Sequence, residues 1–348
     1  MSPHIFLLMF LGLILGTTIT VTSSHWLMAW MGLEINTLAI LPLMAQTHHP
    51  RAVEATTKYF LTQAAAAATL LFASIINAWV SGLWEIQLIN HPIPTTMMMC
   101  ALALKLGLAP MHTWLPEVLQ GLDLTTGLIL STWQKLAPFA LLIQISHQSS
   151  HLMLLFGIAS TLIGGWGGLN QTQLRKVLAY SSIAHLGWMI IVVQFSPSLT
   201  SLALITYIVM TSTIFIVLKM QSLTTINALS TSWTKAPLMA TTLPLALLAL
   251  GGLPPTSGFA PKWFILMELV NQGLPLLATA TALSALLSLY FYLRLSYSSA
   301  LISSPNNLPA TATWRLKPPA SQLPLATLSM ATLFFLPLTP SITALLYI

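Results

Sequence analysis

Long runs of hydrophobic residues, separated by short polar connections, make up most of the chain. A helix needs about 20 apolar residues to cross a bilayer, and eleven runs have about that length or more. The pattern therefore predicts an all-α polytopic membrane protein with about eleven transmembrane helices. The predicted spans are residues 4–22, 26–44, 58–80, 94–115, 124–145, 151–169, 174–195, 199–219, 237–270, 274–295 and 322–345.

Glycine and proline are concentrated in two of these runs, at residues 105–117 and 251–263. Proline removes a backbone donor and clashes with the preceding helical turn, so both helices are predicted to be broken. The run 237–270 would also be about 50 Å long as one helix, against a hydrocarbon core of about 30 Å. Unwound backbone at membrane depth lines a wet cavity or is buried in protein, and a pair of such helices indicates a transporter's ion site.

An internal repeat is predicted from the spacing of ionisable residues. Lys105 and Lys262 are 157 residues apart, and Glu34 and His185 are 151 residues apart, which superposes helices one to five on helices six to ten. Because five is an odd number, the second copy must be inverted in the membrane. The predicted division is a first repeat at 1–148, a second at 149–296, and a loop with a final helix at 297–348.

Charged residues are too rare for a soluble protein. They make up 5% of the chain, against 56% hydrophobic residues, whereas a soluble domain carries about 25%. No soluble domain interrupts the helices, so residues 1–348 are predicted to form a single membrane domain. The chain opens almost directly into a hydrophobic run without an arginine-rich presequence, which predicts insertion where it is made.

Basic residues lie on one predicted side of the membrane. With eleven crossings, the connections on the side of the N-terminus hold nine of the twelve lysines and arginines, and the other connections hold none. The positive-inside rule then places the N-terminus on the cytoplasm-equivalent face and the C-terminus opposite. No basic patch forms, so the net charge of +6 does not indicate nucleic-acid binding. The nine are Arg51, Lys58, Arg175, Lys176, Lys219, Lys235, Arg294, Arg315 and Lys317.

Four charged residues lie inside hydrophobic runs: Glu34, Lys105, Lys135 and Lys262. A charge at mid-membrane costs roughly 2.5 to 3.5 kcal/mol, so the four together oppose insertion by about 10 kcal/mol. Such a cost indicates a function that needs titratable groups. Desolvation disfavours a charged lysine and a nearby carboxylate favours it, so Lys105 would hold or release a proton depending on its distance from Glu34.

Structural alternatives exist for these charges and for the histidines. In the alternative to proton transfer, Glu34 and Lys105 would form a static buried ion pair. The alternative for Lys262 is a side chain that extends to the membrane interface. Histidine side chains ordinarily titrate near neutral pH, so His112 and His185 would either relay protons or pack in the core.

Metal and disulfide chemistry finds no support in the sequence. His147 and His151 have the spacing of helical metal ligands but no third ligand, which predicts interfacial residues and no metal site. Cys100 is the single cysteine, so disulfides and cysteine-ligated clusters within the chain are excluded.

Three stretches, 105–117, 174–187 and 252–262, resemble signatures of the antiporter-like membrane subunits of respiratory complex I, of the animal mitochondrial type. The resemblance covers nearly the whole chain. It implies that Glu34 pairs with Lys105, that Lys135 is the central relay lysine, and that Lys262 is the titratable residue of the second broken helix near the exit. His185 lies where relatives carry a polar central residue.

The resemblance also implies a setting. The chain would be a multi-pass protein of the mitochondrial inner membrane, with its N-terminus on the matrix side and its C-terminus on the intermembrane-space side. Its partners would be other complex I membrane subunits, including the sister antiporter-like subunits, and membrane lipids. NAD, FMN, Fe–S clusters and ubiquinone would bind to other subunits, and this chain would hold no cofactor and no redox active site.

Together with the buried charges, the resemblance implies a proton-translocating core membrane subunit of complex I, the H⁺-translocating NADH:ubiquinone reductase. Protons would move along buried lysines and glutamate, coupled to quinone reduction in other subunits. A stand-alone cation/proton antiporter and a scaffold subunit that does not pump are the alternatives.

Overall fold

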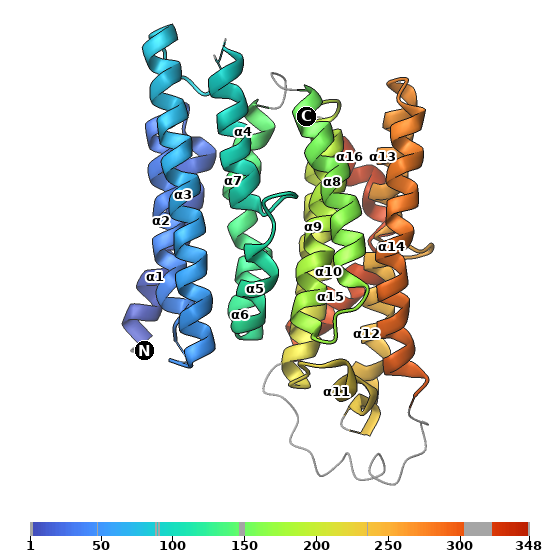
Figure 1. The fold of residues 1–348 in the computed structure, drawn as a ribbon. Helices are drawn as coiled ribbons and strands as arrows, with labels where there is room; N and C mark the ends of the chain where they lie inside the picture. The colour runs from blue at the N-terminus through green and yellow to red at the C-terminus, as the bar shows by residue number, and fades with distance from the viewer. Residues whose placement is uncertain are drawn as a thin grey trace. The chain divides into compact units, whose positions relative to one another are not determined.

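A computed structural model describes residues 3–46, 48–87, 89, 91–145, 150–234, 236–302 and 322–346. The chain forms two compact units, Met1–Ser160 and Thr161–Ile348. Within the described residues, helices are the regular elements, and β-type pairing is limited to two isolated bridges. Figure 1 shows long helices in each unit, which confirms the all-α prediction.

The first unit packs helices that are neighbours in sequence against one another. Helix α1 packs on α2, α2 on α3, and α3 on both α4 and α5, while α7 contacts α1, α2 and α4. The helices are α1 (Pro3–Thr22), α2 (Trp26–Met44), α3 (Pro50–Ser81), α4 (Pro92–Leu106), α5 (Trp114–Gly121), α6 (Leu124–Ser131), α7 (Trp133–Ile145) and α8 (Ser150–Gly168), which crosses the unit boundary.

The second unit is arranged around α10, which contacts α9, α12, α13, α15 and α16. Helix α14 packs on α9, α12 and α13. The elements are α9 (Leu174–Val192), α10 (Pro197–Met220), α11 (Ile226–Ser230), the 3₁₀ helix η2 (Ser232–Thr234), α12 (Pro237–Gly251), α13 (Phe259–Asn271), α14 (Pro275–Ala300), α15 (Leu323–Phe334), the 3₁₀ helix η4 (Leu336–Leu338) and α16 (Thr339–Leu346).

Each unit contains one isolated β-bridge at an equivalent place. His25 pairs with Glu85 in the first unit, and Gln173 pairs with Thr225 in the second. Backbone hydrogen bonds of 3.0 to 3.2 Å flank both bridges. Each bridge fixes the start of one helix, α2 or α9, to the connection that follows the next helix, α3 or α10.

Both predicted helix breaks are present. A glycine follows the last residue of each helix before the break. Gly107 caps α4 with φ of 78°, and Gly252 caps α12 with φ of 79°. Glycine adopts this left-handed conformation without the steric penalty of a Cβ atom, which explains the residue type at both ends. Helical structure resumes at Trp114 in the first unit and at Phe259 in the second.

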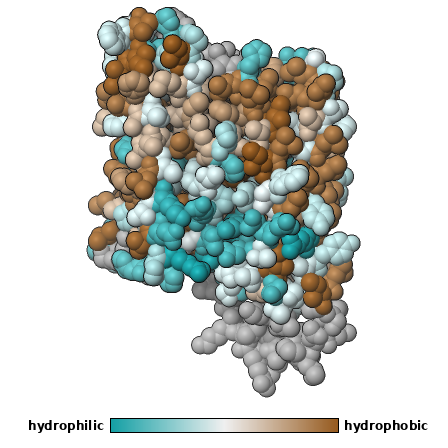
Figure 2. Space-filling view, in the orientation of Figure 1, coloured by the Kyte–Doolittle hydropathy of each residue, from teal (hydrophilic) through white to brown (hydrophobic). Residues whose placement is uncertain are grey.

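The membrane character is clear from the helices themselves. Among the described residues, seven helices are long and apolar enough to cross a membrane, or eight if the bent pair α15 and α16 is one span. Helices α4 and α12 are apolar but shorter. Hydrophobic side chains cover large areas of the visible surface, as expected for contact with lipid (Figure 2). The polytopic class is confirmed, and the count of eleven stays a prediction.

The predicted final helix, 322–345, is not one straight helix. The chain bends by 68° between α15 and the segment Leu336–Leu346. Pro337 lies at this bend and has no N–H to continue a helix, which accounts for the interruption. The expected loop before it lies largely outside the described residues, as does the expected repeat boundary between residues 148 and 149.

Two further helix bounds differ from the prediction. Helix α3 begins at Pro50 rather than at residue 58, because Pro50 suits the first helical turn and the His49 side chain accepts from the N–H of Arg51. The span 124–145 is divided after Ser131, where the hydroxyls of Ser131 and Thr132 both donate to the carbonyl of Leu128, at 3.0 and 2.7 Å. Such bonds from side chain to helix backbone bend helices.

Candidate functional site

A buried cavity in the first unit brings together two of the predicted residues. Lys105 on α4 and Lys135 on α7 both line it, and their exposed fractions are 7% and 3%. The cavity volume is about 20 Å³, which is room for about one water molecule. Five polar residues share the lining: Asn36, Thr37, Tyr59, Gln63 and Gln134.

Glu34 lies on α2, close enough for its charge to act on Lys105. The Oε2 atom of Glu34 and the Nζ atom of Lys105 are both buried without a hydrogen-bond partner. Among the described residues, no ion pair within 4.0 Å joins them. The static Glu34–Lys105 ion pair is therefore absent from this conformation, and Glu34 does not line the cavity that Lys105 borders.

The end of α4 is held in place by side chains from the surrounding helices. The indole N–H of Trp114 donates to the carbonyl of Leu104 at 3.1 Å, and the amide of Gln63 donates to the carbonyl of Lys105 at 3.4 Å. The ring of Tyr59 lies 5.8 Å from that of Trp114. These contacts satisfy carbonyls that lose their donors where the helix ends, and so fix the backbone that carries Lys105.

A second cavity of about 20 Å³ lies in the second unit and is lined by His185 and Lys262, together with Thr206 and Met210. The Nζ atom of Lys262 donates to the carbonyls of Leu250 at 3.1 Å and Gly251 at 2.8 Å. Lys262 on α13 thus reaches back across the break and caps the end of α12. This geometry differs from that of a lysine extended toward the membrane interface.

His185 lies within a cluster of hydroxyl groups. Its Nε2 atom is 3.4 Å from the hydroxyl of Tyr292, and its ring is 5.6 Å from the ring of Tyr207. Ser182 lies near the hydroxyl of Tyr207 and Ser181 near that of Tyr292, and both serine hydroxyls donate to carbonyls of α9. The cluster joins α9, α10 and α14 around one imidazole.

Among the described residues, the histidines other than His185 line neither cavity. His112 is half-buried in the connection between α4 and α5, where its Nδ1 atom is 3.2 Å from the carbonyl oxygen of Pro110. It lines neither cavity. His147 lies outside the described residues. Across the described part of the chain, no three histidine, cysteine, aspartate or glutamate side chains group as metal ligands.

The predicted correspondence between Lys105 and Lys262 stays a prediction, and the two residues lie on opposite sides of their helix breaks. Lys105 precedes the break in its span and Lys262 follows the break in the other. The two glycines that end α4 and α12 are 145 residues apart. At an offset of 145 residues, position 262 would align with position 117 on α5. The offset of 157 instead joins a residue before one break to a residue after the other.

Sequence reasoning missed the side chains that surround the lysines. Gln63 directly precedes a run of five alanines, and it is buried on the cavity wall. A single amide in an apolar run was the available signal. Gln134, next to Lys135, is a second example, and its amide donates to the carbonyl of Asn36 at 3.2 Å.

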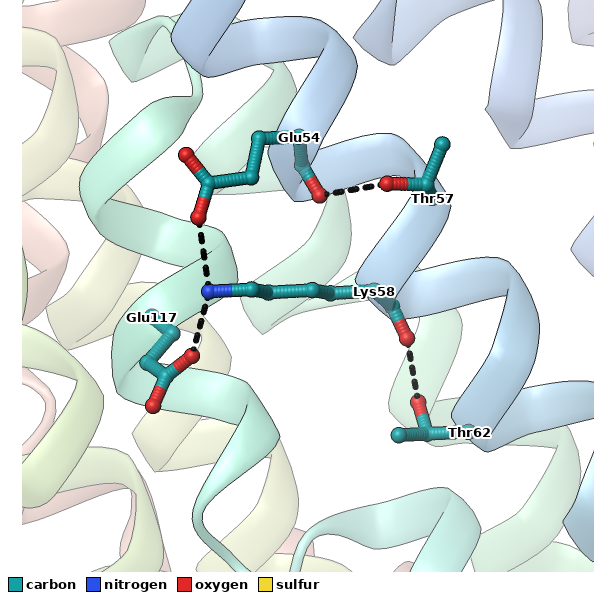
Figure 3. Close-up of polar contacts among 5 residues, drawn as sticks. All are labelled: Glu54, Thr57, Lys58, Thr62 and Glu117. Atoms are coloured by element: carbon teal, nitrogen blue, oxygen red, sulfur yellow. Dashed lines mark hydrogen bonds and ion pairs between the residues drawn. The ribbon is translucent and has the colours of Figure 1, made fainter.

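An ion-pair cluster on the surface of the first unit was also missed. Lys58 lies between Glu54 and Glu117, with its Nζ atom 2.8 Å from a carboxylate oxygen of each (Figure 3). The cluster joins α3 to α5, and Lys58 lies within helix α3 rather than in a loop. All three side chains are exposed, so the cluster is expected to add little stability.

The chain matches two family models. Residues 23–288 match the NADH:quinone oxidoreductase/Mrp antiporter transmembrane family, and residues 289–343 match the NADH dehydrogenase subunit 2 C-terminus. Among curated proteins, NADH-ubiquinone oxidoreductase chain 2 of Tetraodon nigroviridis is 64% identical over 345 residues, and that of Salmo salar is 63% identical over 347 residues. Each match covers 99% of both chains.

Solved structures share the fold. A chain of respiratory complex I from Thermus thermophilus with bound aureothin superposes with a TM-score of 0.88 at 26% identity, covering 99% of this chain and 80% of that one. A chain of the Mrp complex from Dietzia sp. DQ12-45-1b superposes with a TM-score of 0.77 over 95% of this chain and 76% of that one, and at 17% identity it shows the fold alone. The chain therefore belongs to the NADH:quinone oxidoreductase/Mrp antiporter family, and within it to the NADH-ubiquinone oxidoreductase chain 2 group.

Proposed function

We propose that the chain is a proton-translocating membrane subunit of respiratory complex I, the H⁺-translocating NADH:ubiquinone reductase of the mitochondrial inner membrane. One observation carries the proposal: the buried lysines Lys105 and Lys135 border one cavity. Glu34, whose Oε2 atom is buried without a partner, acts on Lys105 through its charge. A buried polar group left without a partner costs about 1 to 3 kcal/mol. Water in the cavity would offset that cost and would connect the two amines.

The expected transfer follows from charge. When Glu34 approaches Lys105, the ammonium form of Lys105 is favoured, and when it withdraws, desolvation favours release of the proton. A proton released into the cavity reaches Lys135, the next basic group on its wall. The absence of an ion pair within 4.0 Å supports this role, since a group that is not locked in a pair can change its charge.

In the second unit, His185 and Lys262 share a cavity and form the corresponding titratable pair. His112 stays a weaker candidate for proton relay, because it lines neither cavity.

The inverted repeat is part of the proposal. The order of helix, bridged helix, long helix and broken span occurs in both units, and the bridges and the two glycine-ended helices support it. All eleven predicted runs contain helix, which supports eleven spans with α4–α5, α6–α7, α12–α13 and α15–α16 as interrupted ones. The nine-to-zero distribution of basic residues supports an N-terminus in the matrix and a C-terminus in the intermembrane space.

The proposed partners are the other membrane subunits of complex I, including the sister antiporter-like subunits. Electrons from NADH pass through FMN and Fe–S clusters to ubiquinone in other subunits. This chain contributes no redox chemistry, and its residues bind and move protons only.

Replacing Glu34 with Gln tests the proposal. The variant should slow quinone-coupled turnover of the assembled complex, while NADH oxidation by an artificial acceptor at the soluble arm stays normal. Glu54→Gln is the matched control, because Glu54 is an exposed glutamate of the same unit. Parallel loss of both activities with the amount of assembled complex would show a structural role instead, as a scaffold subunit requires. Exchange of Na⁺ or K⁺ for protons by the isolated chain in liposomes would favour a stand-alone antiporter.

A further inference from the structure

The break in the second unit contacts the last turn of α15. The hydroxyl of Ser257 donates to the carbonyl of Thr332 at 2.6 Å, and the N–H of Ser257 donates to the same oxygen at 3.4 Å. Both residues are buried, with exposed fractions of 2% and 1%. They are 75 residues apart in sequence, so this contact is purely tertiary.

The Thr332 carbonyl is available because its helix ends there. Carbonyls in the last turn of a helix have no partner further along that helix. Helix α15 ends at Phe334 and the chain then turns by 68°, so the helix does not continue over the Thr332 carbonyl. The interruption of the last span therefore exposes an acceptor, and the interruption between α12 and α13 supplies the donors.

Ser257 sits where a shift would affect Lys262. It is followed by Gly258, which is packed so closely that an added Cβ would lie 3.1 Å from the sulfur of Met210. Helix α13 begins at Phe259 and carries Lys262 in its first turn. Lys262 in turn bonds the carbonyls of Leu250 and Gly251 on the other side of the break. Ser257 thus anchors the short segment before α13, and the position of this segment determines whether the Lys262 side chain can bond to the end of α12.

The anchoring helix lies outside the part of the chain that matches the antiporter family model. That match ends at residue 288, and a separate C-terminal model covers 289–343, which includes all of α15. Helix α15 contacts α10 and α12, the same helices that surround the second break. The antiporter-like part of the second unit is therefore completed by an element belonging to the C-terminal region.

We propose that α15, through the Ser257–Thr332 contact, is a positioning element that fixes the second helix break and sets the placement of Lys262. Ser257 is a positioning residue and does not itself carry a proton. The consequence for pumping rests on the function proposed above, whereas the mechanical role of the contact does not.

Amide hydrogen exchange of the assembled complex tests the mechanical role. Ser257→Ala should raise exchange at residues 252–259 about fivefold, the effect expected from losing one buried hydrogen bond. Exchange at the first break, residues 105–113, should not change. Ser284→Ala is the matched control, because Ser284 is equally buried and its hydroxyl bonds only to Thr281 of its own helix.

Ser257→Cys provides a graded variant, since a thiol is a weaker donor of similar size. It should raise exchange at the second break by about twofold, less than the alanine variant. If Ser257→Ala reduces assembly, the cysteine variant carries the test. Exchange at the second break that matches Ser284→Ala in both variants would overturn the proposal.

Proton translocation per NADH separates this inference from the proposed function. Ser257→Ala should reduce it, Ser257→Cys should reduce it less, and Ser284→Ala should leave it unchanged. Normal pumping by Lys262→Met would contradict the function proposed for Lys262, while the exchange results would still decide the mechanical role of α15.

Discussion

Gly252 provides a direct measure of how strongly Lys262 is held at the helix break. A Cβ atom at this position would lie 2.8 Å from the Cδ atom of Lys262 and 3.0 Å from its Nζ atom. Gly252→Ala should therefore displace the lysine from the carbonyls of Leu250 and Gly251. The same substitution also places alanine at φ of 79°, a conformation that L residues rarely adopt.

The magnitude has two parts. The left-handed conformation costs a residue other than glycine about 1 to 2 kcal/mol. Loss of two hydrogen bonds at about 0.5 to 1.5 kcal/mol each adds about 1 to 3 kcal/mol. Gly273→Ala isolates the first part, because Gly273 has φ of 73° in the same unit and nothing within 4 Å of its would-be Cβ.

A double-mutant cycle gives the second part. The free energy of unfolding is measured for Gly252→Ala, Lys262→Met and the double variant, in detergent micelles with a denaturant titration. We expect a coupling energy of about 1 to 3 kcal/mol between positions 252 and 262, and none between 273 and 262. A coupling below about 0.5 kcal/mol at 252 would refute the reasoning that Lys262 is bound to the end of α12.

Three further outcomes are expected. Gly164→Ala should destabilise the second unit by about 1 to 3 kcal/mol in thermal unfolding, because the new Cβ would meet the backbone of Ala184 at 2.6 Å and force α8 from α9; unchanged stability would contradict that packing. Lys219→Cys should react with an impermeant maleimide only from the matrix side, and labelling in intact mitochondria freed of the outer membrane would reverse the proposed orientation. Glu117→Gln removes one arm of an exposed ion pair, so proton translocation should match wild type, and a pumping defect would show a role for Glu117 although it lines neither cavity.

The helices and their breaks could be predicted from the sequence because they depend on local chemistry. Apolar length gave the spans, and Gly107 and Gly252 marked the two helix ends, since glycine is the residue suited to a left-handed helix end. The start of α3 was placed too late because hydrophobicity was used, whereas Pro50 at the first helical turn was the better signal. The bend near Pro337 was not predicted either, although the proline was the available signal for it.

Contacts between distant helices could not be predicted in the same way. The charge of Lys105 and Lys135 inside apolar runs identified them as candidates, but their common cavity depends on how α4 packs against α7. The spacing of Lys105 and Lys262 did not show that the two residues lie on opposite sides of their helix breaks. The bond from Ser257 to Thr332 joins two helix ends whose meeting has no local signature.

Proton translocation by complex carrying Lys135→Met tests the central claim most directly. Methionine keeps a long flexible side chain but cannot hold a proton, and Lys135 is 3% exposed on the cavity that it shares with Lys105. Lys58→Met is the control, because Lys58 is a lysine of the same unit that is exposed in an ion pair. The account predicts that, per assembled complex in liposomes, Lys135→Met lowers the rate of proton translocation driven by NADH, while Lys58→Met does not and NADH oxidation by an artificial acceptor is unchanged in both. Equal translocation by the Lys135→Met and Lys58→Met complexes would contradict it.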